Sequence, residues 1–188
     1  LMEVIVDEKV KIVFTSAGNP KTWTAFLKNR GITVAHVVSS ASFAQKSEEA
    51  GVDAIVAEGF EAGGHNGREE TTTLCLVPLV CDEVKIPVIA AGGIASGRAV
   101  LAAEALGASG VQVGTRFAAS AESSAHDNYK NRVANSTEGE TRLTLKQLTP
   151  VRLIKNNFYQ KIVEAEKSGA SAEELKKLLG KGRAKHGI

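Results

Sequence analysis

The 188-residue sequence has few of the residues that are typical of nucleic-acid-binding proteins, membrane-spanning proteins and proteins with a structural zinc site. Aromatic residues make up 5% of the chain, and no stretch interleaves them with basic residues as nucleic-acid-binding proteins do. No apolar run approaches the roughly 20 residues that a bilayer-spanning helix needs. The two cysteines, Cys75 and Cys81, show no metal-type spacing to any histidine, which argues against a structural zinc site and fits reduced thiols. The sequence therefore predicts a cytoplasmic protein with no metal site and with neither nucleic acid nor membrane as partner.

The composition is otherwise that of an ordinary globular protein. Hydrophobic residues make up 43% of the chain and charged residues 23%, and the length suits one domain with a substantial core. The charge is unevenly distributed, because residues 1–140 carry 12 basic and 17 acidic side chains whereas residues 141–188 carry 11 and 4. The basic C-terminal segment suits an acidic or phosphorylated partner, but a solvated helical face is the favoured interpretation.

Five short, nearly all-apolar runs rich in β-branched residues are predicted to form buried parallel strands. They are residues 10–15, 33–38, a run ending at Ala57, 87–91 and 110–113. Helical segments lie between them at residues 22–29, 42–50, 71–84 and 97–106. Strict strand–helix alternation predicts a parallel sheet, and the small-residue loop after every strand favours a barrel over an open, doubly wound sheet.

The loop at residues 57–67 follows the third predicted strand and is the most unusual part of the sequence. It holds four glycines, which let a backbone approach a ligand closely, together with Glu58, Glu61 and His65, which supply proton chemistry. A flexible surface loop is the alternative interpretation. We favour a ligand site, because ligands gather at the carboxyl ends of strands in α/β folds.

The loops at residues 90–97 and 112–117 follow the last two predicted strands. Both offer backbone amides, and Thr115 adds a hydroxyl, as expected of the phosphate-binding loops after the last strands of a (β/α)₈ barrel. Tight turns that need glycine for their geometry are the alternative for either loop alone. Neither loop matches the dinucleotide fingerprint or the P-loop, so a Rossmann or nucleoside-triphosphatase site is disfavoured.

The remaining histidines are not expected to be catalytic. His36 lies inside a predicted strand, where an imidazole that is hydrogen-bonded within the core is the favoured interpretation. His126 and His186 lie in polar segments and are expected to be exposed and neutral to function.

The strings at residues 57–67, 86–96 and 111–117, together with residues 15–20, resemble the FMN-dependent nitronate monooxygenases, formerly called 2-nitropropane dioxygenases. They also resemble the related flavin-dependent enoyl-acyl-carrier-protein reductases, and the Glu-Ala-Gly-Gly-His string at residues 61–65 is the specific element. The resemblance implies a TIM (β/α)₈ barrel of which this chain holds the C-terminal five strands. Residues 1–133 would form strands 4–8 with the FMN site, and residues 134–188 a C-terminal helical extension of the same domain. That extension would hold a helix over 150–166 and a second one from a capping box at Ser171 to Gly180.

The same resemblance implies a role for individual residues. His65 would be the catalytic residue beside the flavin. The implied cofactor-binding residues are Glu58, Gly63, Gly92, Gly93, Gln112, Val113, Gly114 and Thr115. Many nitronate monooxygenases carry glutamine at the position of Glu58, so the carboxylate here bears on the choice of subfamily.

Three functions are left open by the sequence. The leading one is the oxidative denitrification of alkyl nitronates with molecular oxygen, and the second is enoyl-acyl-carrier-protein reduction by NAD(P)H through the same FMN. The basic C-terminal segment mildly favours the reductase, because acyl carrier proteins are acidic. The third, a non-catalytic phosphate-binding barrel, is disfavoured by His65 beside two glycines. The expected partners are a nitronate or an enoyl thioester, and NAD(P)H for the reductase; a homodimer is left open.

A closed (β/α)₈ barrel has eight strands and typically about 250 residues. Only five strands can be placed in this sequence. We therefore expect either further residues beyond both ends or a partner chain to complete the barrel.

Overall fold

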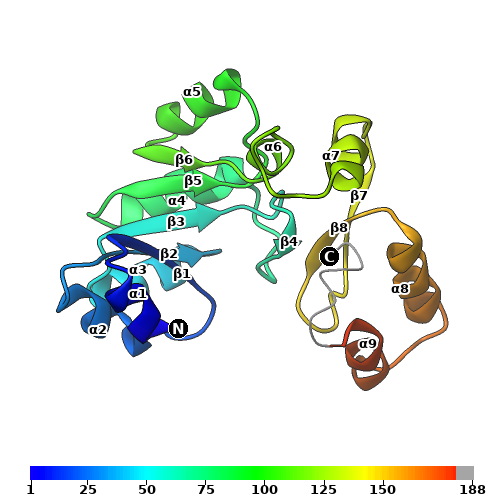
Figure 1. Cartoon of the computed structure of the whole chain (residues 1–188), viewed down its shortest axis with the longest axis horizontal. Helices are drawn as coiled ribbons and strands as arrows, with labels where there is room; N and C mark the ends of the chain where they lie inside the picture. The colour runs from blue at the N-terminus through cyan, green and yellow to red at the C-terminus, as the bar shows by residue number, and fades with distance from the viewer. Residues whose placement is uncertain (181–188) are drawn as a thin grey trace. The chain divides into compact units, whose positions relative to one another are not determined.

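The computed structural model describes residues 1–180 and divides the chain into two compact units (Figure 1). The first unit comprises residues 1–60 and 69–112, and the second comprises residues 61–68 and 113 onward. The chain therefore leaves the first unit after Phe60, contributes a short excursion to the second unit, and returns at Glu69.

The first unit is a five-stranded parallel sheet with helices between its strands. Its strands, in the spatial order β1-β2-β3-β5-β6, are β1 (Ile12–Ser16), β2 (Thr33–Val38), β3 (Ala54–Glu58), β5 (Val88–Ala91) and β6 (Gly110–Gln112). Its helices are α1 (Met2–Asp7), the 3₁₀ turn η1 (Pro20–Thr22), α2 (Thr24–Lys28), α3 (Ala41–Glu49), α4 (Thr73–Glu83) and α5 (Gly97–Ala105). The predicted α/β fold with a parallel sheet is confirmed, and each predicted strand lies within two residues of its observed place at either end.

One face of this sheet is fully packed. Helices α2 to α5 pack against the strands, and Val34, Ile55, Ala57 and Ala90 are completely buried. Side chains that alternate with these along the strands belong to the opposite face, where Ala35, Val56 and Ala91 form a cluster. That second face is open at the β1 edge, where Ile12 and Phe14 are 57% and 53% exposed.

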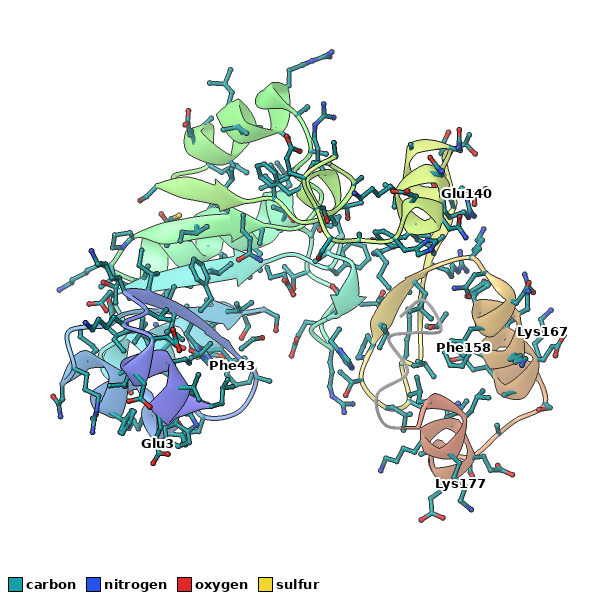
Figure 2. All side chains as sticks on the ribbon, in the orientation of Figure 1. Glu3, Phe43, Glu140, Phe158, Lys167 and Lys177 are labelled. Carbon is teal, nitrogen blue, oxygen red and sulfur yellow. The ribbon has the colours of Figure 1, made fainter. Side chains whose placement is uncertain are left out.

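The second unit is built around a three-stranded antiparallel sheet in the order β4-β8-β7. Its elements are β4 (Gly64–His65), α6 (Thr115–Ala118), α7 (Asp127–Ala134), β7 (Thr141–Thr144), β8 (Val151–Ile154), α8 (Asn157–Lys167) and α9 (Ala172–Leu179). A core of Leu145, Val151, Leu153, Phe158, Ile162 and Leu175 holds the hairpin to the last two helices. Figure 2 shows Lys167 and Lys177 on the outer sides of these helices, away from Phe158.

The helix predicted over residues 150–166 is wrong in its first half. Residues Val151–Ile154 form strand β8, and the helix begins only at Asn157, because the Asn156 side chain caps it by accepting a hydrogen bond from the Tyr159 amide at 2.8 Å. Val151 and Leu153 are buried and alternate with half-buried neighbours at a period of two, which fits the middle strand of a sheet. The segment 134–188 is therefore not purely helical. The last predicted helix is confirmed, with Ser171 and Glu174 forming the expected capping box.

Among the helices within residues 1–180, none is both long and apolar enough to cross a bilayer.

Candidate functional site

Strand register brings two of the predicted cofactor-binding side chains into one row. Glu58 ends β3 and pairs with Ala91 at the end of β5, which in turn pairs with Gln112 at the end of β6. Paired residues in a parallel sheet point to the same face, so Glu58 and Gln112 flank the small side chain of Ala91. Two strand spacings separate them, roughly 10 Å. The row lies on the face opposite the fully buried one, at the carboxyl edge of the sheet.

Glu58 occupies an unusual environment for a carboxyl group. It is half-buried, and burial raises the pKa of its side chain above the ordinary value for glutamate. Within residues 1–180 its carboxyl oxygens have no hydrogen-bond donor or cationic partner. Because its pKa is raised, this carboxyl keeps its proton to a higher pH than an ordinary glutamate, and in the protonated form it can donate a hydrogen bond to a polar ligand as well as accept one.

The backbone just after β5 is held in a fixed shape by close packing. Gly92 has φ +100°, and its carbonyl accepts a hydrogen bond from the Thr73 hydroxyl at 2.9 Å. The Gly59 amide donates to the Ala91 carbonyl at 2.9 Å. A Cβ atom at Gly92 would lie 2.7 Å from the Gly59 carbonyl oxygen and 2.9 Å from the Thr73 Oγ1. Only glycine satisfies both the backbone angle and the available space at this position.

Two backbone amides that follow Gly92 are left without an intramolecular acceptor. Within the described part of the chain, the N–H groups of Gly93 and Ile94 donate no hydrogen bond to the protein. Gly93 is exposed, and helix α5 begins three residues after Ile94 with Ser96 as its N-cap. Free amides next to a helix N-terminus are a suitable environment for an anionic oxygen.

His65 belongs to the second unit. It lies in β4 opposite Val151 of β8, and its side chain is exposed. The preceding Gly64 has φ +89°, a conformation that favours glycine. The Asn66 amide extends the pairing by donating to the Pro150 carbonyl at 2.8 Å. The backbone of His65 is thereby tied to a strand whose side chains form the core of the second unit.

The predicted site residues fall into two groups, one in each compact unit. Glu58, Gly92, Gly93 and Gln112 lie at the carboxyl edge of the sheet in the first unit. The other predicted residues, Gly63, His65, Val113, Gly114 and Thr115, belong to the second unit. The predicted loop at residues 57–67 is therefore divided between the two units after Phe60. At this point the Phe60 amide donates a hydrogen bond to the Thr71 carbonyl at 3.0 Å, which joins the two ends of the excursion.

His36 is a buried core imidazole, as the sequence predicts. It is 5% exposed, and its Nδ1 lies 2.7 Å from the Thr15 Oγ1 on the neighbouring strand. Burial lowers the pKa of this imidazole below the ordinary value for histidine. His126 is exposed and caps α7 by accepting from the Asn128 amide at 3.1 Å, and His186 lies outside the described residues.

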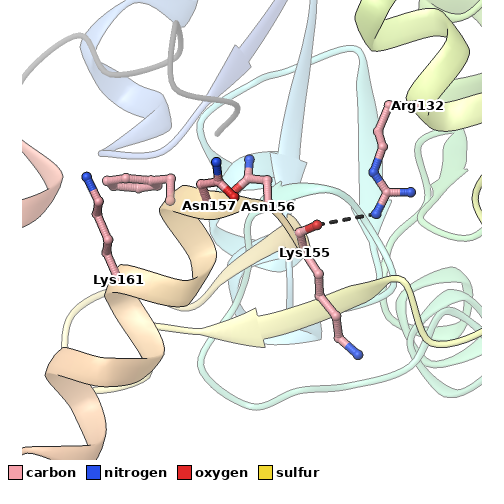
Figure 3. A pocket seen from close by; sticks show the side chains of 6 residues that line it. Arg132, Lys155, Asn156, Asn157 and Lys161 are labelled. Carbon is pink, nitrogen blue, oxygen red and sulfur yellow. Dashed lines mark hydrogen bonds between the residues drawn. The ribbon is translucent and has the colours of Figure 1, made fainter.

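A cavity of about 390 Å³ lies in the second unit, and none of the predicted site residues lines it (Figure 3). Its lining residues are Arg132, Lys155, Asn156, Asn157, Phe158 and Lys161. The Arg132 guanidinium forms an ion pair with Glu140 and lowers the pKa of that carboxyl. Arg132 also donates to the Lys155 carbonyl at 3.3 Å, so its guanidinium has both an anionic partner and a carbonyl partner within the chain.

Two residues that shape the candidate site were missed by the sequence analysis. Thr73 was included in a predicted helix, and nothing in its sequence context indicates that its hydroxyl holds the Gly92 carbonyl. Asn66 was part of the central loop but received no role, although a small polar side chain next to two glycines is a typical turn signal.

Comparison with known proteins gives a consistent result. The nitronate monooxygenase family model matches residues 1–187. A probable nitronate monooxygenase from Staphylococcus saprophyticus is 38% identical, over 87% of this chain and 49% of that protein. FabK from Thermotoga maritima superposes with a TM-score of 0.84 at 48% identity, covering 88% of this chain and 53% of that chain. Nitroalkane oxidase from Streptomyces ansochromogenes gives 0.74 at 32%, covering 85% and 49%. The chain spans about half the length of these relatives.

Proposed function

The chain belongs to the nitronate monooxygenase family, and from this premise we propose that it acts as an FMN-dependent oxidoreductase in the oxidative denitrification of alkyl nitronates with molecular oxygen. Its five parallel strands then correspond to strands 4–8 of a TIM barrel. The substrate of such an enzyme is a small molecule.

The observation that carries the proposal is the carboxyl edge of the sheet in the first unit. Gly92 is locked in place, and the free amides of Gly93 and Ile94 follow it directly before α5. This arrangement suits a phosphate group, which accepts hydrogen bonds from backbone amides and is stabilised by a helix N-terminus. FMN carries one such phosphate, and the chain has no dinucleotide fingerprint that would favour FAD.

The side chains on the same edge suit the ring of the cofactor. Glu58 and Gln112 flank Ala91 in one row at the carboxyl end of the sheet. Glu58 in its protonated form and the Gln112 amide can each donate a hydrogen bond to a ring carbonyl or nitrogen. In the second unit, the proposed roles of Gly63, Val113, Gly114 and Thr115 as further cofactor contacts rest on the family resemblance.

His65 is the proposed proton-transfer residue. When bound, FMN supplies the two-electron redox chemistry. The exposed imidazole of His65 can generate the nitronate from a neutral nitroalkane by accepting, at a ring nitrogen, the proton from the carbon next to the nitro group. Toward a nitronate that is already formed, it can donate a hydrogen bond to an oxygen of the nitronate group. Its backbone is fixed by the β4–β8 pairing, which favours a defined direction for the side chain.

A second candidate function is an FMN-dependent enoyl-acyl-carrier-protein reductase that uses NAD(P)H. It is favoured by the 48% identity to FabK, an enoyl-acyl-carrier-protein reductase, which exceeds the identity to the probable nitronate monooxygenase. The two functions share the FMN site and differ in the electron donor.

FMN binding is the first experimental consequence. The purified protein is expected to be yellow, to release unmodified FMN on denaturation, and to quench the fluorescence of added FMN in titration after the cofactor is removed. FAD serves as the matched control and is expected to bind more weakly, since no site for its adenosine half is indicated. A colourless protein with no affinity for added FMN would contradict the proposal.

A further inference from the structure

The Asn66 side chain is buried directly beside the exposed His65. Asn66 is 8% exposed, and successive residues of an extended segment point to opposite sides. Burial of Asn66 therefore directs His65 outward. Its amide donates to the Pro150 carbonyl at 2.8 Å, which fixes this alternation against β8.

The carboxamide of Asn66 holds the turn that precedes His65. Its Nδ2 donates to the Ala62 carbonyl at 2.9 Å and to the Gly64 carbonyl at 3.0 Å. Both protons of the amide are thereby used on two carbonyls of the same turn. A buried carboxamide with two such bonds is costly to move, because each carbonyl would lose its donor away from water.

The glycine before His65 is where this restraint acts, in addition to the pairing of β4 with β8. Gly64 has φ +89°, and a Cβ built there would meet no atom within 4 Å, so glycine is required by the backbone angle and not by crowding. A glycine is more flexible than other residues, and at Gly64 the pairing with Arg152 of β8 and the hydrogen bond from Asn66 are the two restraints on the backbone. Among the described residues, the Asn66 carboxamide is the only side chain that bonds the Ala62 and Gly64 carbonyls.

We propose that Asn66 is a positioning residue, which fixes the glycine turn through the Ala62 and Gly64 carbonyls and so places the His65 imidazole for proton transfer. This inference rests on the proposed role of His65. A misplacement of about 1 Å can cost on the order of 10²-fold in rate, so a side chain that only shapes the backbone can have a catalytic effect.

A double-mutant cycle in the FMN-loaded protein tests the inference. Asn66→Ala is expected to lower kcat about 10- to 100-fold while KM and the FMN dissociation constant stay within about twofold. In a His65→Ala background the same substitution is expected to change kcat by less than about twofold, because Asn66 acts through His65. Asn135→Ala is the matched control: Asn135 is exposed, its carboxamide donates to one carbonyl at 2.8 Å, and kcat is expected to be unchanged.

The outcomes separate the inference from the proposed function. An equal loss from Asn66→Ala in both backgrounds, or no loss in either, overturns the positioning role alone. If His65→Ala retains the parental kcat, the proposed role of His65 fails first and the inference fails with it.

A measurement on the unmutated protein keeps the test decisive if Asn66→Ala does not fold. The side-chain NH₂ protons of Asn66 are expected to exchange with solvent at least about tenfold more slowly than those of Asn135, because two hydrogen bonds and burial protect them. Equal exchange rates would show that the carboxamide does not hold the turn and would overturn the proposal.

Discussion

Replacement of His65 by alanine is expected to lower kcat by about 10²- to 10⁴-fold while FMN remains bound. The physical reason is that the proposed role of His65 is proton transfer, whereas the amides proposed to hold the cofactor phosphate belong to Gly93 and Ile94. The side chain of His65 is exposed, so its removal leaves the core of the second unit intact. Steady-state turnover of a neutral nitroalkane, which still carries the proton to be removed, measures the first expectation, and the flavin absorbance of the same preparation measures the second.

His126→Ala is the control for this substitution. His126 is also exposed, but it caps α7 instead of following the glycine turn, so kcat is expected to stay within about twofold even if the lost cap lowers stability by about 1 kcal/mol. If His65→Ala instead loses FMN, and activity returns to the parental value once FMN is restored, then His65 is structural.

Gly92→Ala is expected to destabilise the first unit by about 2–5 kcal/mol and to weaken FMN binding by at least about tenfold. About 1–2 kcal/mol arises from placing a Cβ at a positive φ, and about 1–3 kcal/mol from overpacking against the Gly59 carbonyl and the Thr73 hydroxyl. Relief of this clash must displace the chain that carries the Gly93 amide. Urea unfolding and fluorescence titration with FMN measure the two effects.

Gly31→Ala separates backbone strain from steric clash. Gly31 also has a positive φ, +73°, but a Cβ there would meet nothing within 4 Å. Its replacement is expected to cost only about 1–2 kcal/mol and to leave the FMN dissociation constant unchanged. A Gly92→Ala protein with the stability of Gly31→Ala and parental FMN affinity would refute the account of the Gly92 turn.

The first unit could be predicted from the sequence because its strands are buried on one face by helices and flanked by small-residue loops. Residues 33–38 were predicted as a strand with the bounds that the structure shows. In the second unit, the capping box at Ser171 predicted the helix that follows it. These signals are local: apolar β-branched runs, caps and glycine stops.

The hairpin of the second unit could not be predicted in the same way. Val151, Ile154, Phe158 and Ile162 have a spacing that fits one face of a helix, but the first two belong to a strand. A four-residue apolar run is ambiguous between the two periods, and its pairing with β7 and β4 decides the matter. Strand β4 has only two residues, which is too short for a hydrophobic pattern, and it is defined by its hydrogen-bonded pairing with β8.

The candidate site was predictable in its residue types and less so in its geometry. Glycines and a histidine after an apolar run indicate a ligand loop, but the sequence does not show that Glu58 and His65 fall in different units. The hydrogen bonds made by Thr73 and Asn66 to backbone carbonyls depend on tertiary contacts. No local pattern specifies them.

The most direct test of the proposed function is anaerobic mixing of the FMN-loaded protein with an alkyl nitronate and, separately, with NADH and NADPH. The visible absorbance of the flavin reports its reduction in each case. We expect the nitronate to bleach the flavin rapidly and both nicotinamides to leave it oxidised on the same time scale. Rapid bleaching by NADH or NADPH with none by the nitronate would contradict the nitronate monooxygenase assignment and establish the enoyl-reductase alternative as the better account.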